Sequence, residues 1–202
     1  MTVSPLPPTC ILGSRMVTNS TPVFVLLSGG IDSTACVAFF ASQGFSVSAV
    51  FVDYGQAARL KEMSAASAVA SHFGIPLSKI SCTGVRKKAD GMIPGRNAFL
   101  ISVASMEFDS SCGMLSLGVH SGTDYWDCSP EFANLMQTML DGYSDGRIRL
   151  NFPFMTWTKR DVWDFALTRN APLNLTYSCE LGLDQPCGRC QTCGDLQKLR
   201  AS

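Results

Sequence analysis

The chain has 202 residues, of which 46% are hydrophobic and 16% are charged, and its formal net charge at pH 7 is zero. This length accommodates one substantial core with a small appendage, and the composition is that of an ordinary globular protein. A neutral chain lacks the electrostatic attraction with which proteins bind nucleic acid or anionic membranes, so neither is expected as the main partner. No apolar run approaches the roughly 20 residues that span a bilayer, so no membrane segment is predicted.

The first residues of the chain are expected to form a flexible leader. Residues 1–21 contain three prolines and a glycine and lack the continuous apolar run of a signal peptide, and Met16 is an alternative start. The nine cysteines are an odd number, and no secretion signal precedes them. This combination is typical of reduced thiols in a cytoplasmic protein.

The most informative stretch is Ser-Gly-Gly-Ile-Asp-Ser-Thr at residues 28–34, which follows an apolar run at 23–27. Two glycines let the backbone approach an anion, and the hydroxyls and the N–H groups of the following helix start can donate to it. No Lys follows the second glycine, which distinguishes this turn from the Walker loop. The pattern predicts a loop that holds pyrophosphate while the α-phosphate of a nucleotide is attacked. Taken alone, these seven residues are equally consistent with an ordinary glycine-rich turn.

Strand and helix patterns alternate along the rest of the chain. Apolar and alternating runs predict strands at 22–27, 46–52, 77–82, 114–119 and 147–152. Helical patterns with capping signals predict helices at 33–43, 57–73, 97–108, 130–140 and 158–169. Such alternation predicts a Rossmann-like α/β fold, a parallel sheet with helices on both faces. Ligands bind at the carboxyl ends of the strands in such sheets, so residues 28–34, 53–56 and 120–127 should converge on one cleft.

Four cysteines near the end of the chain have the spacing of a metal site. They form C-x7-C-x2-C-x2-C at Cys179, Cys187, Cys190 and Cys193. Four thiolates complete a tetrahedral zinc shell with no open position, so a structural zinc is expected rather than a catalytic one. The alternative, four buried reduced cysteines, is less consistent with a polar, glycine-rich stretch. These cysteines divide the chain into a nucleotide-binding domain at 22–175 and a zinc-binding element at 176–202, which should clamp the tail beside the cleft.

Several motifs together resemble the 7-cyano-7-deazaguanine synthase (QueC-like) family of the PP-loop, or N-type ATP pyrophosphatase, superfamily. The resemblance extends from about residue 23 to 199 and rests, besides the cysteines, on the stretches 28–34, 51–56, 94–97, 127–128 and 130–132. It implies an adenine nucleotide alpha hydrolase-like fold. It also implies a carbon–nitrogen ligase of queuosine biosynthesis that uses ATP and Mg²⁺. Such an enzyme converts a 7-carboxy-7-deazaguanine and ammonia to the nitrile (preQ0) through an adenylate.

The resemblance also implies roles for individual residues. The pyrophosphate-binding residues would be Leu27, Ser28, Gly29, Gly30, Ile31, Ser33 and Thr34. Asp32 would either cap the helix or help to hold Mg²⁺. The adenosine would lie against Asp53, Tyr54, Gly55 and Gln56. Arg96 and Lys159 would be the cations that balance the phosphate charge. Together with Asp32, they would be the candidate catalytic residues. The heterocycle would contact Asp124, Tyr125 and Asp127.

Simpler structural roles remain open for three of the residues in these motifs. Tyr54 is equally explained by packing, and the solvated start of a helix is the more common explanation of a residue such as Lys159. Trp126 is equally explained as a core residue.

The chain departs from the family pattern at several positions. Ala57 and Ala58 stand where the family usually has a basic residue and a His, and residues 83–93 form a shorter loop than usual. Trp126 replaces a usual Pro, and Ser129 replaces a usual Arg, which removes a bidentate partner for a carboxylate. The identity of the activated acid is therefore open.

Two alternatives to the nitrile-forming ligase follow. One is a diverged relative that transfers the activated deazaguanine to another acceptor, such as a protein amine. The other is a non-enzymatic binding module with a nucleotide site and a zinc knuckle. Family members often pair, so a homodimer is a further expectation.

Overall fold

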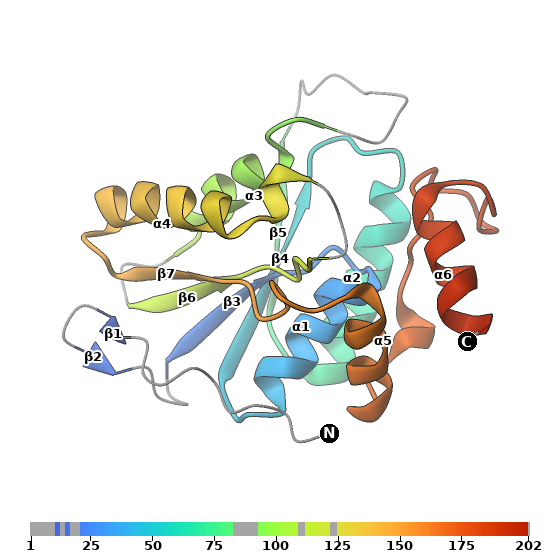
Figure 1. The fold of residues 1–202 in the computed structure, drawn as a ribbon, viewed down its shortest axis with the longest axis horizontal. Helices are drawn as coiled ribbons and strands as arrows, with labels where there is room; N and C mark the ends of the chain where they lie inside the picture. Colours follow the sequence, from blue (N-terminus) through green and yellow to red (C-terminus); the bar gives the residue numbers. More distant parts are fainter. Residues whose placement is uncertain are drawn as a thin grey trace.

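The computed structural model describes residues 11–12, 15–16, 21–82, 93–108, 112–121 and 125–201. A five-stranded parallel sheet with strand order β5-β4-β3-β6-β7 forms its centre (Figure 1). The strands are β3 (Pro22–Leu26), β4 (Ser46–Asp53), β5 (Leu77–Ser81), β6 (Gly113–Ser116) and β7 (Ile148–Asn151). Inside the predicted leader, the two-residue strands β1 (Ile11–Leu12) and β2 (Arg15–Met16) pair antiparallel.

Helices cover both faces of the sheet. They are α1 (Ile31–Ala41), α2 (Arg59–Phe73), α3 (Arg96–Ser105), α4 (Pro130–Ser144), α5 (Lys159–Thr168) and α6 (Gln191–Ala201). Helices α3 and α4 lie on one face, α1, α2 and α5 lie on the other, and α6 lies at the edge of the molecule beside α2 and α5 (Figure 1). The predicted fold class, a parallel α/β sheet with a cysteine-rich element at the end of the chain, is confirmed.

The two cores follow from the alternation of side chains along the central strand. Val23, Val25 and Leu27 pack with α1, α2 and α5 in one cluster. Leu26, between two of them in sequence, packs on the opposite face with α3 and α4. Successive side chains of a strand point to opposite faces, so a strand apolar throughout must be covered on both sides. This arrangement places β3, and the turn that follows it, at the centre of the molecule.

Most of the helix boundaries agree with the sequence to within a few residues. The predicted helix at 130–140 was too short, because α4 continues to Ser144 and ends where Asp145 adopts φ 49°. The predicted strand at 114–119 was too long, because β6 ends at Ser116. Helix α6 was not predicted. Ser129 accepts a hydrogen bond from Phe132 N as the predicted N-cap of α4.

Other terminal signals were also correct. Gly74 ends α2 with φ 64°, and Thr158 and Asp161 form the expected capping box at the start of α5. In the part of the chain that the structure describes, no helix is both long and apolar enough to cross a membrane.

The strand order reverses next to β3. The chain moves from β3 outward through β4 and β5, then returns to the other side of β3 to form β6 and β7. Loops on the two sides of such a reversal separate from one another and leave a crevice at the carboxyl ends of the strands. The predicted convergence of the loops at this edge is therefore a consequence of the topology.

Candidate active site at the carboxyl edge of the sheet

A cavity of about 980 Å³ lies at this edge. Of the residues predicted for nucleotide, substrate and catalysis, twelve line it: Leu27, Ser28, Gly30, Ile31, Asp32, Ser33, Tyr54, Gln56, Arg96, Tyr125, Asp127 and Lys159. Four others do not line it, namely Gly29, Thr34, Asp53 and Gly55. Asp124 lies outside the described residues. The volume is at the upper end of the range for ligand pockets, which run from about 300 to 1,000 Å³.

The turn at residues 27–34, called the phosphate loop below, has a shape that requires glycine. Gly29 has φ 81°, and a Cβ atom there would lie 2.5 Å from the carbonyl oxygen of Glu62. Within the loop, Ser33 Oγ donates to Gly30 O at 3.0 Å, and Ser28 Oγ accepts from Gly30 N at 3.3 Å. Gly30 is the N-cap of α1, and no side chain caps this helix. The first-turn N–H groups have no partners within the helix, so they are suited to an anion.

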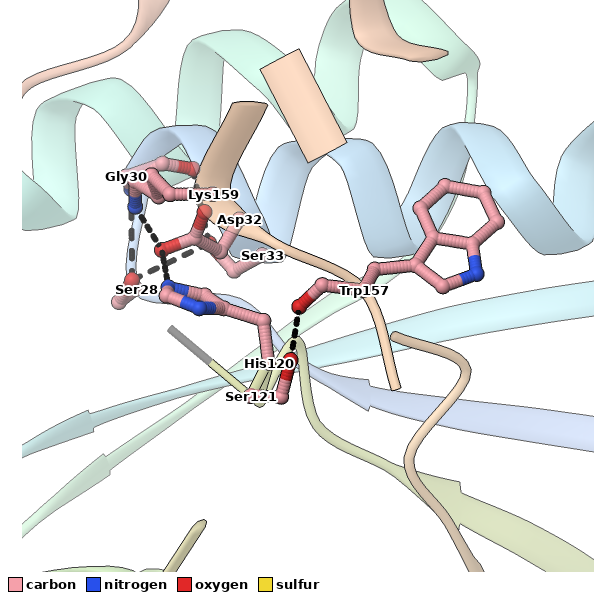
Figure 2. A network of polar contacts seen from close by, with 8 residues as sticks. All are labelled: Ser28, Gly30, Asp32, Ser33, His120, Ser121, Trp157 and Lys159. Atoms are coloured by element: carbon pink, nitrogen blue, oxygen red, sulfur yellow. Dashed lines mark hydrogen bonds and ion pairs between the residues drawn. The ribbon is translucent and has the colours of Figure 1, made fainter. Parts of the chain in front are cut away.

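Asp32 lies inside the first turn of α1, so the alternative that it caps the helix is wrong. Its Oδ2 accepts a hydrogen bond from Lys159 Nζ (Figure 2). Its Oδ1 is buried and has no hydrogen-bond partner among the described residues. The side chain of Lys159 is 27% exposed and paired, so the alternative of a solvated helix start is also wrong. The buried unpaired oxygen is suited to a cation, because hard divalent ions prefer carboxylate oxygens.

His120 is a residue of the site that the motifs did not single out. It follows β6 and is 9% exposed, and its Nε2 lies 3.9 Å from Asp32 Oδ2 (Figure 2). Burial lowers the pKa of its imidazole, while Asp32 opposes this shift and Lys159 adds to it. This shift favours the neutral form of the imidazole. The sequence signal that could have identified His120 is its position in the stretch 120–127, which was expected at the edge of the sheet.

Gly118 brings the end of β6 against the phosphate loop. A Cβ atom at this position would lie 2.5 Å from the carbonyl oxygen of Asp32 and 3.0 Å from Ser33 N. All of the nearest atoms belong to the backbone, which cannot rotate away as a side chain can. The phosphate loop can therefore occupy this position only because Gly118 has no side chain.

The turn after β4 holds Glu62 toward the cavity. Gln56 Oε1 accepts from Tyr54 N at 2.9 Å, and Gln56 Nε2 donates to Glu62 Oε2 at 2.9 Å and to Val52 O at 3.2 Å. Both ends of the Gln56 amide are thus used within the turn. Asp53 Oδ1 accepts from Gly55 N at 2.9 Å, which stabilises the same turn. Asp53 and Gln56 therefore shape this side of the cavity rather than present free groups to it.

Burial raises the pKa of the Glu62 carboxyl, while the hydrogen bond from Gln56 and the charge of Arg96 lower it. Tyr54 lines the cavity and also packs edge-on against Phe99, with ring centroids 6.4 Å apart. The packing explanation of Tyr54 and its place in the cavity are thus both correct.

A short 3-10 helix, η1 (Trp126–Cys128), forms another side of the cavity. Trp126 is 54% exposed, so the alternative that it is a core residue is wrong. Tyr125 Oη donates to Gln191 Oε1 at 3.4 Å, which links η1 to the first residue of α6. Ser129, at the position of the family Arg, is occupied by capping α4.

The four cysteines at 179–193 form a compact group. Their Sγ atoms all lie within 4.8 Å of one another. Cys187 N donates to Cys179 Sγ at 3.4 Å, and Cys190 N donates to Cys187 Sγ at 3.3 Å. Such N–H donors stabilise the negative charge of a thiolate. A closed set of four thiolates is a ligand set that zinc accepts in structural sites. The geometry of the four cysteines therefore permits the predicted metal site.

The sheet, its reversal point and the lysine-free glycine turn define a nucleotide-binding α/β protein of the PP-loop class. Solved structures share the fold. A predicted subunit of tRNA methyltransferase from Methanocaldococcus jannaschii has a TM-score of 0.50 at 16% identity over 82% of this chain and 99% of that one. The U34-tRNA thiolase NcsA from Methanococcus maripaludis, with its [4Fe-4S] cluster, has a TM-score of 0.50 at 14% identity over 93% of this chain and 68% of that one.

The sequence comparisons are more specific. The family model described as queuosine biosynthesis protein QueC matches residues 22–89 and 83–199, so the chain belongs to the QueC family. A 7-cyano-7-deazaguanine synthase from Synechococcus sp. (strain CC9605) is 32% identical, over 83% of this chain and 87% of the relative. The synthase of Brucella anthropi is 31% identical, over 84% of this chain and 84% of the relative. The synthase of Desulfotalea psychrophila is 29% identical, over 86% of this chain and 91% of the relative.

Proposed function

We propose that the chain is an ATP-dependent ligase that activates a carboxylate, of the 7-cyano-7-deazaguanine synthase type. The observation that carries the proposal is that one cavity joins the lysine-free phosphate loop to Tyr125 and Asp127, the residues expected at the heterocycle. A flat ring stacks on an aromatic side chain, and a carboxylate accepts from ring N–H and amino groups. The family membership agrees with this substrate class.

The nucleotide would bind with its β- and γ-phosphates on the phosphate loop. The cations of Lys159 and Arg96, which both line the cavity, would balance the phosphate charge. The unpaired Oδ1 of Asp32 would hold Mg²⁺, which shields phosphate charge when it is bound. Tyr54 lies on the side proposed for the adenosine. The chain thus supplies positions and charges, which is most of what adenylation requires from a protein.

The reaction that fits these groups has two activations. The carboxylate oxygen of the acid attacks the α-phosphorus of ATP, pyrophosphate leaves, and a mixed anhydride with AMP forms. Ammonia attacks the acyl carbon and expels AMP, which leaves an amide. The amide oxygen then attacks the α-phosphorus of a second ATP, and a second pyrophosphate leaves. AMP departs with that oxygen while the nitrogen loses two protons, which forms the nitrile.

One observation favours a second candidate. Ser129 replaces the family Arg and is engaged as the cap of α4, so this position supplies no cation to a substrate carboxylate. A relative that hands the adenylated deazaguanine to a protein amine would use the same first step and differ in the acceptor. The structural zinc, the cytoplasmic location and the pairing of two chains belong to the proposal in either case.

Exchange of radiolabelled pyrophosphate into ATP tests the shared first step. We expect exchange with 7-carboxy-7-deazaguanine and none with benzoate or guanine. Mass spectrometry after addition of ammonia should then detect the nitrile, while a mass increase on a lysine-containing peptide would identify the second candidate. ATP that binds without exchange, for every acid tried, would overturn the ligase in favour of a non-enzymatic binding module.

A further inference from the structure

We infer that the cysteine-rich end of the chain is a functional part of the nucleotide site, and that the backbone amide of Tyr177 positions the phosphate loop. The residues 176–201 are called the cysteine module below. This inference deepens the proposed function, on which it rests, because it concerns the same nucleotide. It goes beyond a purely structural zinc, since it makes nucleotide affinity depend on the module.

A direct hydrogen bond joins the module to the loop. Tyr177 N donates to Gly29 O at 2.9 Å. That oxygen belongs to the peptide unit between Gly29 and Gly30, whose N–H donates to Ser28 Oγ at 3.3 Å. A peptide unit is planar, so holding its oxygen also fixes the direction of its N–H. Tyr177 and Ser28 therefore hold one peptide of the phosphate loop from its two sides.

The segment that carries Tyr177 is itself held by the cysteine group. Cys179 follows Tyr177 by two residues and is one of the four clustered thiols. Between them, Ser178 O accepts a hydrogen bond from the hydroxyl of Thr192. Thr192 lies in turn between Cys190 and Cys193. A metal that draws the four sulfur atoms together would therefore fix the segment from both directions.

The module also docks on the elements that surround the loop. Leu199 of α6 is buried with Ile31, the first residue of α1, and with Trp163 of α5. Arg160 Nη1 donates to Leu199 O at 3.2 Å. These contacts place α6 against the helix that begins at the phosphate loop and against the helix that carries Lys159.

A second region of contact joins the module to the start of α2. Gly182 has φ 68°, and a Cβ atom there would lie 2.5 Å from Ala57 O. Asp184 forms an ion pair with Lys61. Ala57 and Ala58 stand where the family usually has larger side chains, and Ala58 is 2% exposed beneath the module. The small residues thus permit the close approach of the two backbones.

The module supplies one side of the cavity. Its residues in the lining include Tyr177, Ser178, Glu180, Thr192, Asp195 and Lys198. A bound nucleotide would therefore lie against the module as well as against the loop. Coupling between two binding sites is reciprocal. Bound ATP should therefore raise the affinity for the metal by the same factor by which the bound metal raises the affinity for ATP.

Two substitutions at Tyr177 separate its amide from its side chain. Thr176 has φ −80° and ψ 154°, the extended conformation that a residue before proline requires, so the residue before position 177 does not oppose Tyr177→Pro. Tyr177→Pro removes the N–H, whereas the control Tyr177→Ala keeps it. Both remove the hydroxyl that donates to Leu183 O at 2.7 Å. The difference between the two variants therefore reports the loss of the bond to Gly29, together with the proline ring that takes the place of the N–H.

We expect Tyr177→Pro to bind ATP and pyrophosphate about tenfold more weakly than Tyr177→Ala, since a carbonyl of the loop loses its partner. Zinc content should be the same for both variants, while Tyr177→Pro should melt a few degrees lower because it loses a hydrogen bond. A merely structural role of this bond would lower the melting temperature and leave the ATP affinity of the two variants equal. Equal affinities for ATP, beside normal pyrophosphate exchange by the wild type, would overturn the inference and leave the ligase intact. Failure of the wild type to bind ATP would instead overturn the ligase and the inference together.

A measurement on the wild-type protein decides the matter even if Tyr177→Pro fails to fold. Zinc release to a coloured chelator is followed with ATP or AMP present, in excess Mg²⁺. ATP should slow release severalfold and AMP, which lacks the pyrophosphate, should not. Equal release rates with ATP and with AMP would overturn the coupling.

Discussion

Asp32 and Lys159, which are 127 residues apart in the chain, form an ion pair where the phosphate loop enters α1 (Figure 2). Their side chains are 28% and 27% exposed, so the pair is partly withdrawn from water. It joins the first turn of α1 to the first residue of α5. The cation is thereby held where the phosphates of a nucleotide would lie, and one oxygen of the carboxylate remains unpaired among the described residues.

The first prediction concerns Lys159. Replacing it with Ala removes a positioned cation next to the departing pyrophosphate, and loss of one such group typically costs about 10²–10³-fold in rate. We expect Lys159→Ala to lower kcat/KM for pyrophosphate exchange within that range. Lys159→Arg should keep part of the rate. Lys79→Ala changes an exposed lysine of β5 outside the cavity lining, so it should leave exchange unchanged. Normal exchange by Lys159→Ala would show that the pair is only structural.

The pairing of Asp32 and Lys159 marks the limit of what the sequence could predict. Residues 28–34 and the cysteines are local motifs whose spacing determines what they can bind, so both were found directly. The ion pair depends on how α5 packs against α1, which no local pattern contains. For the same reason, capping and solvation were reasonable explanations of Asp32 and Lys159 before the structure excluded them.

The missed helix has a different cause. Helix α6 (Gln191–Ala201) contains Cys193 and Gly194 and is largely polar, so it lacks the apolar stripe that predicts a helix. It is stabilised by docking, with Leu199 buried against Ile31. The strands were easier to predict, because β3 and β4 are apolar runs buried on both faces. Their register and the reversal at β3 then placed the loops at one edge.

The second prediction tests the metal site. Cys190→Ser removes one of four ligands, and the binding energy of a structural zinc contributes to folding. We expect the wild type to hold about one zinc per chain and the variant to hold much less, with a lower melting temperature. Cys112→Ser, in a cysteine outside the cluster, is the matched control and should keep its zinc. Zinc in Cys190→Ser at the wild-type level, measured by atomic emission, would argue against the site.

The third prediction uses the raised pKa of Glu62. The folded protein retains this proton to a higher pH than the unfolded chain does, because burial raises the pKa from its ordinary value near 4.5. The resulting stability is complete below the ordinary pKa and is lost as the pH rises through the raised one. The neutral side chain of Glu62→Gln should avoid this loss. It should therefore melt at a higher temperature than the wild type at pH 7–8.

The difference in melting between Glu62→Gln and the wild type should vanish near pH 4. Each kcal/mol corresponds to roughly 2–4 °C for a domain of this size. Melting curves from pH 4 to 8 measure the difference in melting temperature between Glu62→Gln and the wild type. Glu107→Gln, at an exposed position, is the control. A difference that is constant with pH would show that titration of the buried Glu62 carboxyl is not its cause.

The fourth prediction concerns Ser129, which caps α4 through its bond from Phe132 N at 3.2 Å. Ser129→Ala should lower the free energy of unfolding by about 1 kcal/mol, the usual cost of losing an N-cap. Ser129→Asp keeps an acceptor and should retain the stability. Ser129→Arg restores the family residue but loses the cap, so it should be as unstable as Ser129→Ala. Urea unfolding of the three variants measures these differences, and equal stability of all three would show that the cap contributes little.

The fifth prediction concerns the contact between Gly118 and the phosphate loop. In Gly118→Ala the added methyl group would lie 2.5 Å from the carbonyl oxygen of Asp32, so the loop or the end of β6 must move. Overpacking of this kind costs about 1–3 kcal/mol. Because the displaced atoms carry the phosphate-binding N–H groups, ATP affinity should fall as well, by at least severalfold.

Gly142 provides a matched control for Gly118→Ala. It lies within α4, and apart from its chain neighbours and the helix's own backbone no atom lies within 4 Å of a Cβ placed there. Alanine is favoured over glycine in a helix by about 0.5–1 kcal/mol, so Gly142→Ala should be slightly more stable than the wild type and bind ATP equally well. Titration calorimetry with ATP separates the two cases. If Gly118→Ala lost stability but bound ATP like the wild type, the position of the loop would not depend on β6, and the glycine would serve packing alone.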